Sequence, residues 1–196
     1  MNHTITTNHP IHELLKQRWS PYAFSDRLIQ TSDLMSLFEA ARWAPSSYNE
    51  QPWRFLVAPR QNKEAFTKVL DCLLPANVEW AQHASALVLA VTHHTFERNG
   101  KPNKAAIHDL GAAVSYLTFE ATARDILMHQ IIGIEPELAH KRFAIPSDHE
   151  VFTAFALGYA NEEIKEEGFA QRDLVRRPRK ALSEFVYTTQ WGDAFT

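Results

Sequence analysis

The chain has 196 residues, of which 45% are hydrophobic and 22% are charged, and its formal net charge is −3. This balance is typical of one globular domain over residues 1–196, excludes a disordered chain and gives no indication of nucleic-acid or membrane-surface binding. The single cysteine, Cys72, excludes an internal disulfide, and the polar N-terminus lacks a signal-peptide pattern. No apolar run approaches the ~20 residues that a membrane helix requires. We therefore expect a cytoplasmic protein.

Hydrophobic periodicity predicts an α+β protein, with a small mixed sheet flanked by helices. The predicted helices are residues 9–18, a helix capped by Thr31 or Ser32, residues 62–74, 103–128 and 136–143. The last of these begins at a proline, which favours the first helical position. The predicted strands are residues 53–58, 86–91 and 151–159. The run at 86–91 is entirely apolar, as in strands buried on both faces. The longest helix carries a predicted apolar face of Ile107, Leu110, Val114, Leu117 and Ala121.

A polar turn with the sequence APSSYNEQPW, residues 44–53, separates a predicted helix from a predicted strand. Pro45 and Pro52 disfavour helix at the residues before them, so the helix must end near Ala44. Between the prolines lie short polar side chains and free backbone donors, which a polar, planar ligand needs. An ordinary capped turn is the alternative, and the density of polar residues favours a ligand-binding turn.

Basic residues occur near both chain ends. Arg18 and Ser20 lie just before Pro21, and an arginine with a hydroxyl can bind a phosphate, although an exposed helix-end arginine is the simpler interpretation. A second basic segment surrounds Pro178 and consists of Arg176, Arg177, Arg179 and Lys180. Its functional interpretations are a phosphate clamp or a nuclear localisation signal, but the segment alone favours a solvated charged loop. Together the two segments form a plausible two-sided phosphate site.

Several other chemistries lack their patterns. The six glycines are too far apart for a Rossmann or P-loop motif, so a nucleotide cofactor would not be held on such a turn. The ten histidines show no metal-binding spacing, and we expect no metal. The absence of a G-x-S-x-G motif leaves a hydrolase as a weak alternative. His129 and Gln130, at the end of the longest predicted helix, are as consistent with core packing as with a site.

Four segments, in order, resemble the nitroreductase family of flavin enzymes. RWSPYAF at 18–24 is similar to the family pattern R-x-S-x-[RK]-x-F, and the turn at 44–53 is similar to A-P-S-x-x-N-x-Q-P-W. The third segment is the alanine-rich helix after HDLGAA at 108–113, leading to His129, Gln130 and Gly133. The fourth is ALGY at 156–159, followed by RPRK at 177–180.

The resemblance implies a domain-swapped homodimer with exchanged terminal arms and two FMN molecules at the subunit interface. It assigns the FMN phosphate to Arg18, Ser20, Arg177 and Arg179. By the same likeness the turn would approach the flavin from the other subunit, Asn77 would meet the pyrimidine edge, and the backbone from Gln130 to Gly133 would lie near N5. The full candidate set is Arg18, Trp19, Ser20, Tyr22, Pro45, Ser46, Ser47, Asn49, Asn77, His129, Gln130, Gly133, Arg177 and Arg179.

The implied activity is hydride transfer from NADH or NADPH to a small acceptor such as a nitroaromatic, a quinone or an enal, by a ping-pong mechanism. No catalytic acid or base is assigned. Tyr22 and Trp80 stand where family members carry cations that would stabilise reduced flavin, and we expect Arg54 or a helix N-terminus to substitute. The alternatives are a flavin carrier or sensor without turnover and a dimeric interaction module without a ligand. The aromatic tail, residues 187–196, is expected to bury on a partner subunit.

Overall fold

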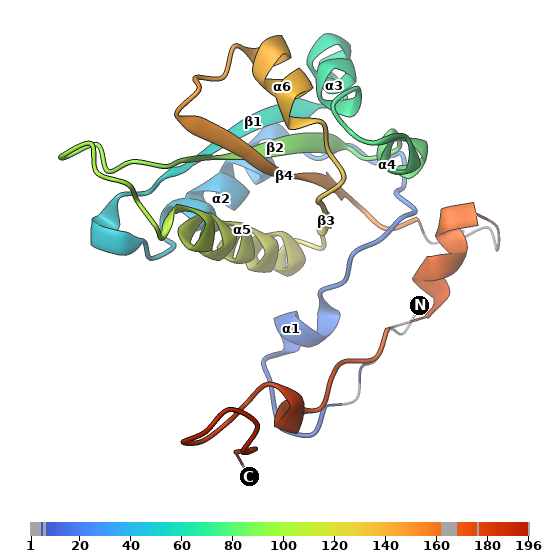
Figure 1. Cartoon of the computed structure of the whole chain (residues 1–196). Helices are drawn as coiled ribbons and strands as arrows, with labels where there is room; N and C mark the ends of the chain where they lie inside the picture. The colour runs from blue at the N-terminus through green and yellow to red at the C-terminus, as the bar shows by residue number, and fades with distance from the viewer. Residues whose placement is uncertain (1–4, 6, 162–167, 176, 196) are drawn as a thin grey trace.

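The computed structural model describes residues 5, 7–161, 168–175 and 177–195 and has three layers (Figure 1). The middle layer is a sheet of β1 (Trp53–Pro59), β2 (Ala86–His93), β3 (Leu127–Ile131) and β4 (His149–Gly158). The strand order is β1-β2-β4-β3, and every strand pair is antiparallel over the residues described. The α+β class is confirmed.

The predicted mixed sheet is wrong, and the β1–β2 connection explains part of the difference. It contains two helices, α3 (Lys63–Leu70) and α4 (Pro75–Ala81), where one helix from 62 to 74 was expected. A single crossover helix favours parallel strands, whereas two helices return the chain to the edge it left. Pro59, the last residue of β1, pairs with Ala86, the first residue of β2, so the two strands run antiparallel.

Helices cover both faces of the sheet (Figure 1). One face packs against α2 (Thr31–Arg42) and α5 (Ala106–Ala123), and the other against α3, α4 and α6 (Pro136–Phe143). β2 serves both cores, because Val88 and Ala90 point to the first and Leu87, Leu89 and Val91 to the second. The prediction of a strand buried on both faces is confirmed.

The longest helix ends earlier than the sequence indicates. Arg124 is the C-cap of α5, and Asp125 adopts a left-handed conformation with φ 58°, which stops the helix. The chain then turns into β3, a strand that was not predicted, so His129 and Gln130 lie on a strand rather than at a helix end. Ile107 was expected on the buried face of α5 but is 40% exposed.

The remaining elements agree closely with expectation. α6 has the predicted bounds, while α1 (Glu13–Gln17) is shorter than the predicted helix. The N-cap of α2 is Gln30, not Thr31 or Ser32. The three-residue helix η1 (Ser47–Asn49) lies in the polar turn.

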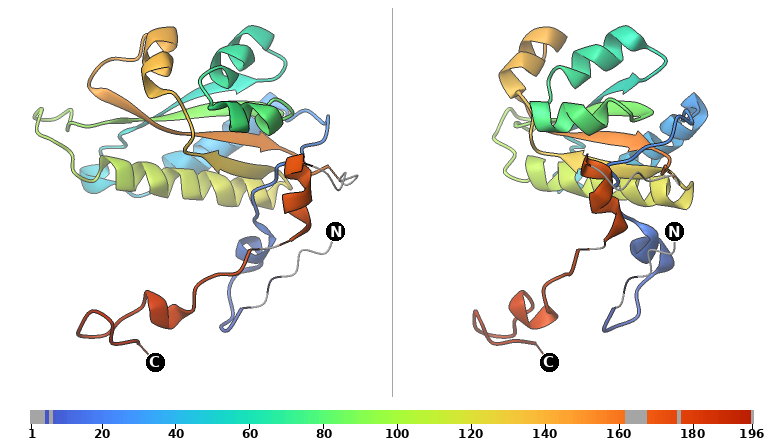
Figure 2. Two further views of the ribbon diagram at one scale, coloured as in Figure 1. Left: turned by 45° about the vertical axis from the view of Figure 1, so that its right-hand side comes forward. Right: turned by 90° about the vertical axis from the view of Figure 1, so that its right-hand side faces the viewer.

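Two terminal arms extend away from the three-layer core (Figure 2). The N-terminal arm carries α1, and the C-terminal arm carries η2 (Gly168–Leu174) and η3 (Leu182–Glu184). The sequence also predicts an acidic, solvated loop from Asn161 to Gly168, of which residues 162–167 lie outside the described residues, as does Arg176 of the basic segment. Across the described part of the chain, no helix combines the length and the apolar character needed to cross a membrane.

Candidate functional site

The backbone of the polar turn, residues 44–53, is strained. Tyr48, Asn49 and Gln51 all have positive φ, at 55°, 57° and 52°. Such conformations cost on the order of 1–3 kcal/mol each in residues other than glycine and persist only where the surroundings hold them. Ser46 contributes by accepting a hydrogen bond from the backbone N–H of Gln51 at 3.0 Å. The concentration of strain in one short turn is typical of a functional site.

The turn is anchored to the first turn of α5. The backbone N–H of Ser47 donates to Asp109 Oδ2 at 2.9 Å, and Asp109 is only 3% exposed. A carboxylate near a helix N-terminus is favoured by the helix dipole, so this anchor is stable in its own right. Asp109 was not among the predicted site residues, and its position in the segment HDLGAA was the only sign of its role.

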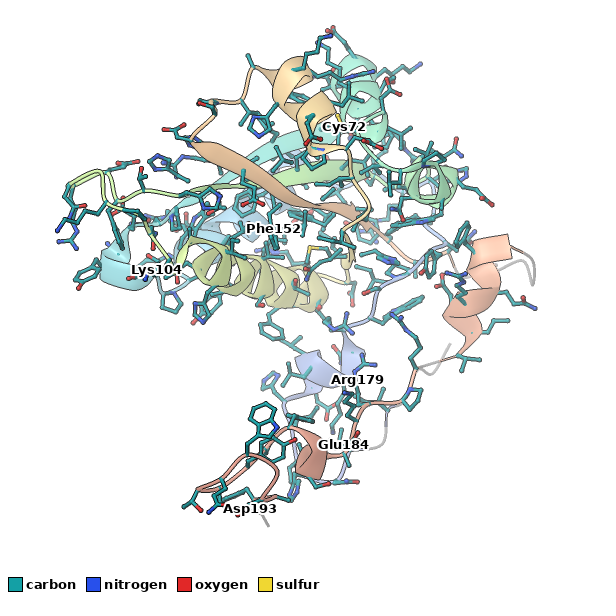
Figure 3. All side chains as sticks on the ribbon, in the orientation of Figure 1. Cys72, Lys104, Phe152, Arg179, Glu184 and Asp193 are labelled. Carbon is teal, nitrogen blue, oxygen red and sulfur yellow. The ribbon has the colours of Figure 1, made fainter. Side chains whose placement is uncertain are left out.

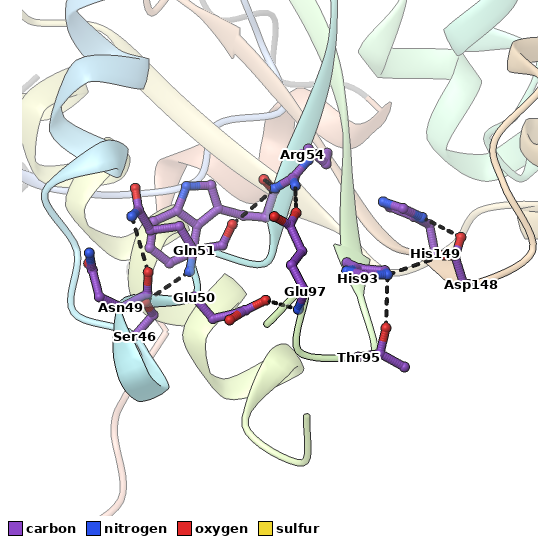
Figure 4. A network of polar contacts seen from close by, with 11 residues as sticks. Ser46, Asn49, Glu50, Gln51, Arg54, His93, Thr95, Glu97, Asp148 and His149 are labelled. Carbon is purple, nitrogen blue, oxygen red and sulfur yellow. Dashed lines mark hydrogen bonds and ion pairs between the residues drawn. The ribbon is translucent and has the colours of Figure 1, made fainter. Parts of the chain in front are cut away.

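A β-hairpin, residues 94–103, supports the turn from the other side (Figure 4). Glu97 donates its backbone N–H to Glu50 Oε1, and its carboxylate pairs with Arg54 at 3.0 Å. Arg54 also donates to the carbonyl oxygen of Gln51 at 3.0 Å. Tyr48 packs edge-to-face on Phe96 of the hairpin. The turn is therefore held on both sides before any ligand binds.

A second group of predicted residues lies between the two arms. Arg18 Nη1 donates to Ser20 Oγ at 3.3 Å, and burial followed by the charges of Arg179 and Arg177 lowers the pKa of Arg18. Figure 3 shows Arg179 beside α1 and away from the sheet. Three guanidinium groups close together form an arrangement suited to a multiply charged anion.

These arginines line a groove of about 1570 Å³ between the arms. Trp19, Ser20 and Tyr22 line it from the N-terminal arm, and Pro178 and Lys180 line it from the C-terminal arm. The sequence predicted that the two basic segments meet, and the structure brings them together.

Asp173 explains how the arms are joined, and the sequence analysis missed it. Its carboxylate accepts the backbone N–H groups of Tyr22, at 2.9 Å to Oδ2, and of Ala23, at 2.8 Å. It is 3% exposed although it lies in a polar, charged stretch, which gave no signal of burial. This contact fixes η2 against the segment that follows Arg18.

His129 lies among aromatic rings and contacts Tyr22, which lines the groove. Its Nδ1 donates to the carbonyl oxygen of Pro21 at 2.8 Å, which leaves Nε2 as an acceptor. The imidazole stacks on Trp80 at 4.4 Å and meets the edge of Tyr22 at 4.6 Å. Burial, with smaller contributions from Arg177 and Arg18, lowers the pKa of His129, so the ring is neutral near pH 7.

Helix α4 adds two further groups to this end of the molecule. Asn77 Nδ2 donates to the carbonyl oxygen of Gly133 at 3.0 Å, and a Cβ at Gly133 would lie 2.5 Å from that nitrogen. The indole N–H of Trp80 is buried without a hydrogen-bond partner among the described residues. Gln130 is exposed on β3. The predicted residues Asn77 and Gly133 are thus in direct contact.

The two groups of site residues lie at opposite ends of α5. The turn contacts the first turn of this helix, while His129 lies on the strand that follows its last turn. An 18-residue helix is about 27 Å long at 1.5 Å per residue. Within one chain, Pro45, Ser46, Ser47 and Asn49 are therefore not brought to the groove.

Comparison with known proteins finds similarity over most of the chain. Residues 15–159 match the model of the Nitroreductase family. A 15.4 kDa uncharacterised protein of Mycolicibacterium smegmatis is 30% identical over 148 residues, which cover 71% of this chain and 98% of that protein. A protein of Archaeoglobus fulgidus, provisionally named NADH dehydrogenase/NAD(P)H nitroreductase, is 27% identical over 161 residues, 77% of this chain and 86% of that one.

Solved structures extend the likeness to the arms. A crystal structure described as an oxidoreductase containing FMN superimposes with a TM-score of 0.89 at 26% identity and covers 96% of each chain. A nitroreductase family protein of Clostridium difficile has a TM-score of 0.70 at 23% identity, over 91% of this chain and 97% of that one, and so shares the fold. The resemblance read from the four sequence segments is confirmed, and the chain belongs to the nitroreductase family.

Proposed function

We propose that this chain is an FMN-dependent oxidoreductase that takes hydride from NADH or NADPH and delivers it to a small organic acceptor such as a nitroaromatic, a quinone or an enal. The observation that carries the proposal is the cluster of Arg18, Arg177 and Arg179 in a groove that Tyr22 also lines, with His129 against the Tyr22 ring. Family membership and the FMN-containing neighbour support it. The cytoplasm is the proposed location.

The residues present fit FMN at its charged end. Burial and, to a smaller extent, the charges of Arg179 and Arg177 lower the pKa of Arg18, and a bound phosphate dianion would offset those charges. Ser20 Oγ, already bonded to Arg18, adds a neutral donor. Arginine binds phosphate in a bidentate manner, so these groups would fix orientation as well as provide affinity.

His129, Asn77 and Gly133 would position the ring system. When bound, FMN supplies the hydride-accepting and hydride-donating chemistry, and the protein supplies position and electrostatics. Neutral His129 presents Nε2 as an acceptor, while its Nδ1 is held by Pro21. Asn77 donates to the carbonyl oxygen of Gly133, and the missing side chain of Gly133 leaves the room that the Asn77 amide occupies. We assign no catalytic acid or base.

The distance between turn and groove supports a homodimer in which each site takes its groove from one subunit and its turn from the other. Two subunits exchanging their arms would also cover the exposed aromatic residues of the C-terminal tail. One site used in turn by the nicotinamide nucleotide and by the acceptor would give ping-pong kinetics.

The deciding experiment is the visible absorption spectrum of the purified protein before and after anaerobic addition of NADH or NADPH. The proposal predicts a flavin spectrum that bleaches on addition of one of the two. A flavin spectrum that does not bleach would favour the carrier or sensor, which Tyr22 and Trp80 at the expected cation positions make the second candidate. A colourless protein that fails to bind added FMN would contradict both and favour an interaction module.

The identity of the cation that stabilises reduced flavin forms a separate part of the proposal. We propose Arg54, which borders the turn and would reach the flavin with it from the other subunit. Its ion pair with Glu97 offsets part of its charge, so its effect on the reduction potential should be small.

A further inference from the structure

A group of three metal-ligating side chains lies apart from both the groove and the turn. It consists of His93, Asp148 and His149, at the point where β2 ends and β4 begins. The sheet register pairs His93 directly with His149, and their rings stack with centroids 4.6 Å apart. Figure 4 shows both rings beside Asp148, so two imidazoles from neighbouring strands share one carboxylate.

The distances within this group are close to those of a coordination sphere. His149 Nδ1 lies 2.8 Å from Asp148 Oδ1, and His93 Nε2 lies 3.2 Å from Asp148 Oδ2. One ligand atom from each residue falls within 4.8 Å of the others. Nitrogen and oxygen ligands at about 2.0–2.2 Å from a tetrahedral ion lie about 3.3–3.6 Å apart, so modest side-chain shifts would complete the set.

The surroundings allow an ion to enter from solvent and allow the side chains to rotate toward it. The side chains of His93 and His149 are 12% and 18% exposed, and that of Asp148 is 55% exposed, so an ion can enter from solvent. The ring planes differ by 23°, and rotation about the ring-bearing bonds would turn both nitrogens toward one ion. Thr95 Oγ1, 3.0 Å from His93 Nε2, or a water molecule would supply a fourth ligand.

We propose that His93, Asp148 and His149 bind a divalent transition-metal ion of the Zn²⁺, Ni²⁺ or Cu²⁺ class. Two imidazole nitrogens and a carboxylate oxygen suit these ions, whereas Ca²⁺ and Mg²⁺ prefer oxygen ligands alone. The ion takes the place of the hydrogen bonds between the rings and Asp148, each ring then carries its proton on its other nitrogen, and the ion joins β2 to β4. It sits at the base of the hairpin 94–103, which supports the polar turn. The proposal is independent of the flavin chemistry.

The test is calorimetric titration of Zn²⁺ into the full chain as purified, with His93→Gln and His149→Gln as test variants. The matched control is His94→Gln, because His94 is adjacent in sequence but pairs with Glu150 at 2.6 Å. We expect one saturable site per chain in the wild type, at least tenfold weaker binding in each test variant, and wild-type affinity in the control. Circular dichroism checks that the variants are folded.

Three results would overturn the proposal. The first is the lack of saturable Zn²⁺ binding up to about 1 mM. The second is unchanged Zn²⁺ affinity in His93→Gln and His149→Gln. The third is a loss of affinity in His94→Gln that equals the loss in those two variants. Should a histidine variant fail to fold, Asp148→Asn takes its place, because Asp148 is half exposed and the amide keeps its size. Wild-type affinity in Asp148→Asn would then count against the site.

Discussion

The polar turn and the terminal arms differ in how firmly contacts within their own subunit fix them. The turn, although strained, is fixed by buried Asp109 on one side and by Glu97 and Arg54 on the other. The C-terminal arm instead exposes large aromatic side chains, with Trp191 93% and Phe195 66% exposed. The turn is preorganised within one subunit, whereas the arm presents surface that a second subunit would cover. This difference is the physical basis of the proposed dimer.

Removal of the tail should have the largest effect. Deleting residues 187–196 removes Trp191 and Phe195, whose burial on a partner is worth on the order of several kcal/mol, so the dimer should dissociate at least a hundredfold more readily. Analytical ultracentrifugation across a concentration series measures this. An unchanged dissociation constant would show that the tail is not an interface, and the change Met35→Ala, at another exposed apolar residue on α2, serves as the control.

The arginine cluster should show the next largest effect. Arg18→Ala removes a charge-assisted contact worth about 1.5–3 kcal/mol, which corresponds to about a 10- to 150-fold loss of FMN affinity. Arg18→Lys should recover part of it, because the charge stays while the bidentate geometry is lost. Fluorescence titration of FMN into stripped protein measures the affinity. Arg124→Ala, which breaks ion pairs with Asp33 and Glu120 on α5, should leave it unchanged.

The anchor of the turn can be broken without touching the groove. Asp109→Leu leaves the Ser47 N–H without its buried acceptor and should lower the free energy of unfolding by about 1–3 kcal/mol. Asp109→Asn retains an acceptor oxygen and should lose less. Urea unfolding of both variants makes the comparison, and equal losses would show that the charge, rather than the hydrogen bond, holds the turn.

His129 should make stability depend on pH. Burial lowers its pKa in the folded state, so between that value and about 6.5 the unfolded chain binds more protons. Its contribution is therefore complete above about pH 6.5 and is lost as the pH falls below that value. His129→Asn keeps a donor for Pro21 but does not titrate, so its unfolding free energy should fall less steeply from pH 7 to pH 5. Identical slopes would contradict the assignment.

The smallest expected effect concerns Arg54. Arg54→Ala should move the flavin reduction potential to a more negative value, by less than about 30 mV, since Glu97 already offsets the charge. Spectroelectrochemical titration resolves such a shift, and an unchanged potential would remove Arg54 as the substitute cation. Arg60→Ala, at an arginine that instead pairs with Asp26, is the matched control.

The sequence was most informative where local chemistry decides the structure. The prolines of the turn, the buried run of β2 and the basic segments at both ends were all recognisable. β3 was missed because a short apolar segment after a helix fits helix or strand equally well, and only the left-handed Asp125 separates them. Asp109 and Asp173 were missed as anchors because the sequence alone does not distinguish a buried acidic residue from a solvated one. The distinction requires knowledge of the backbone N–H groups that bond to the carboxylate.

The central claim is that a complete flavin site needs two subunits, and native mass spectrometry of the purified protein tests it most directly. The account predicts a particle of twice the 22.4 kDa chain mass that carries two FMN molecules, together with free monomer that carries none. A monomer that retains FMN would contradict it.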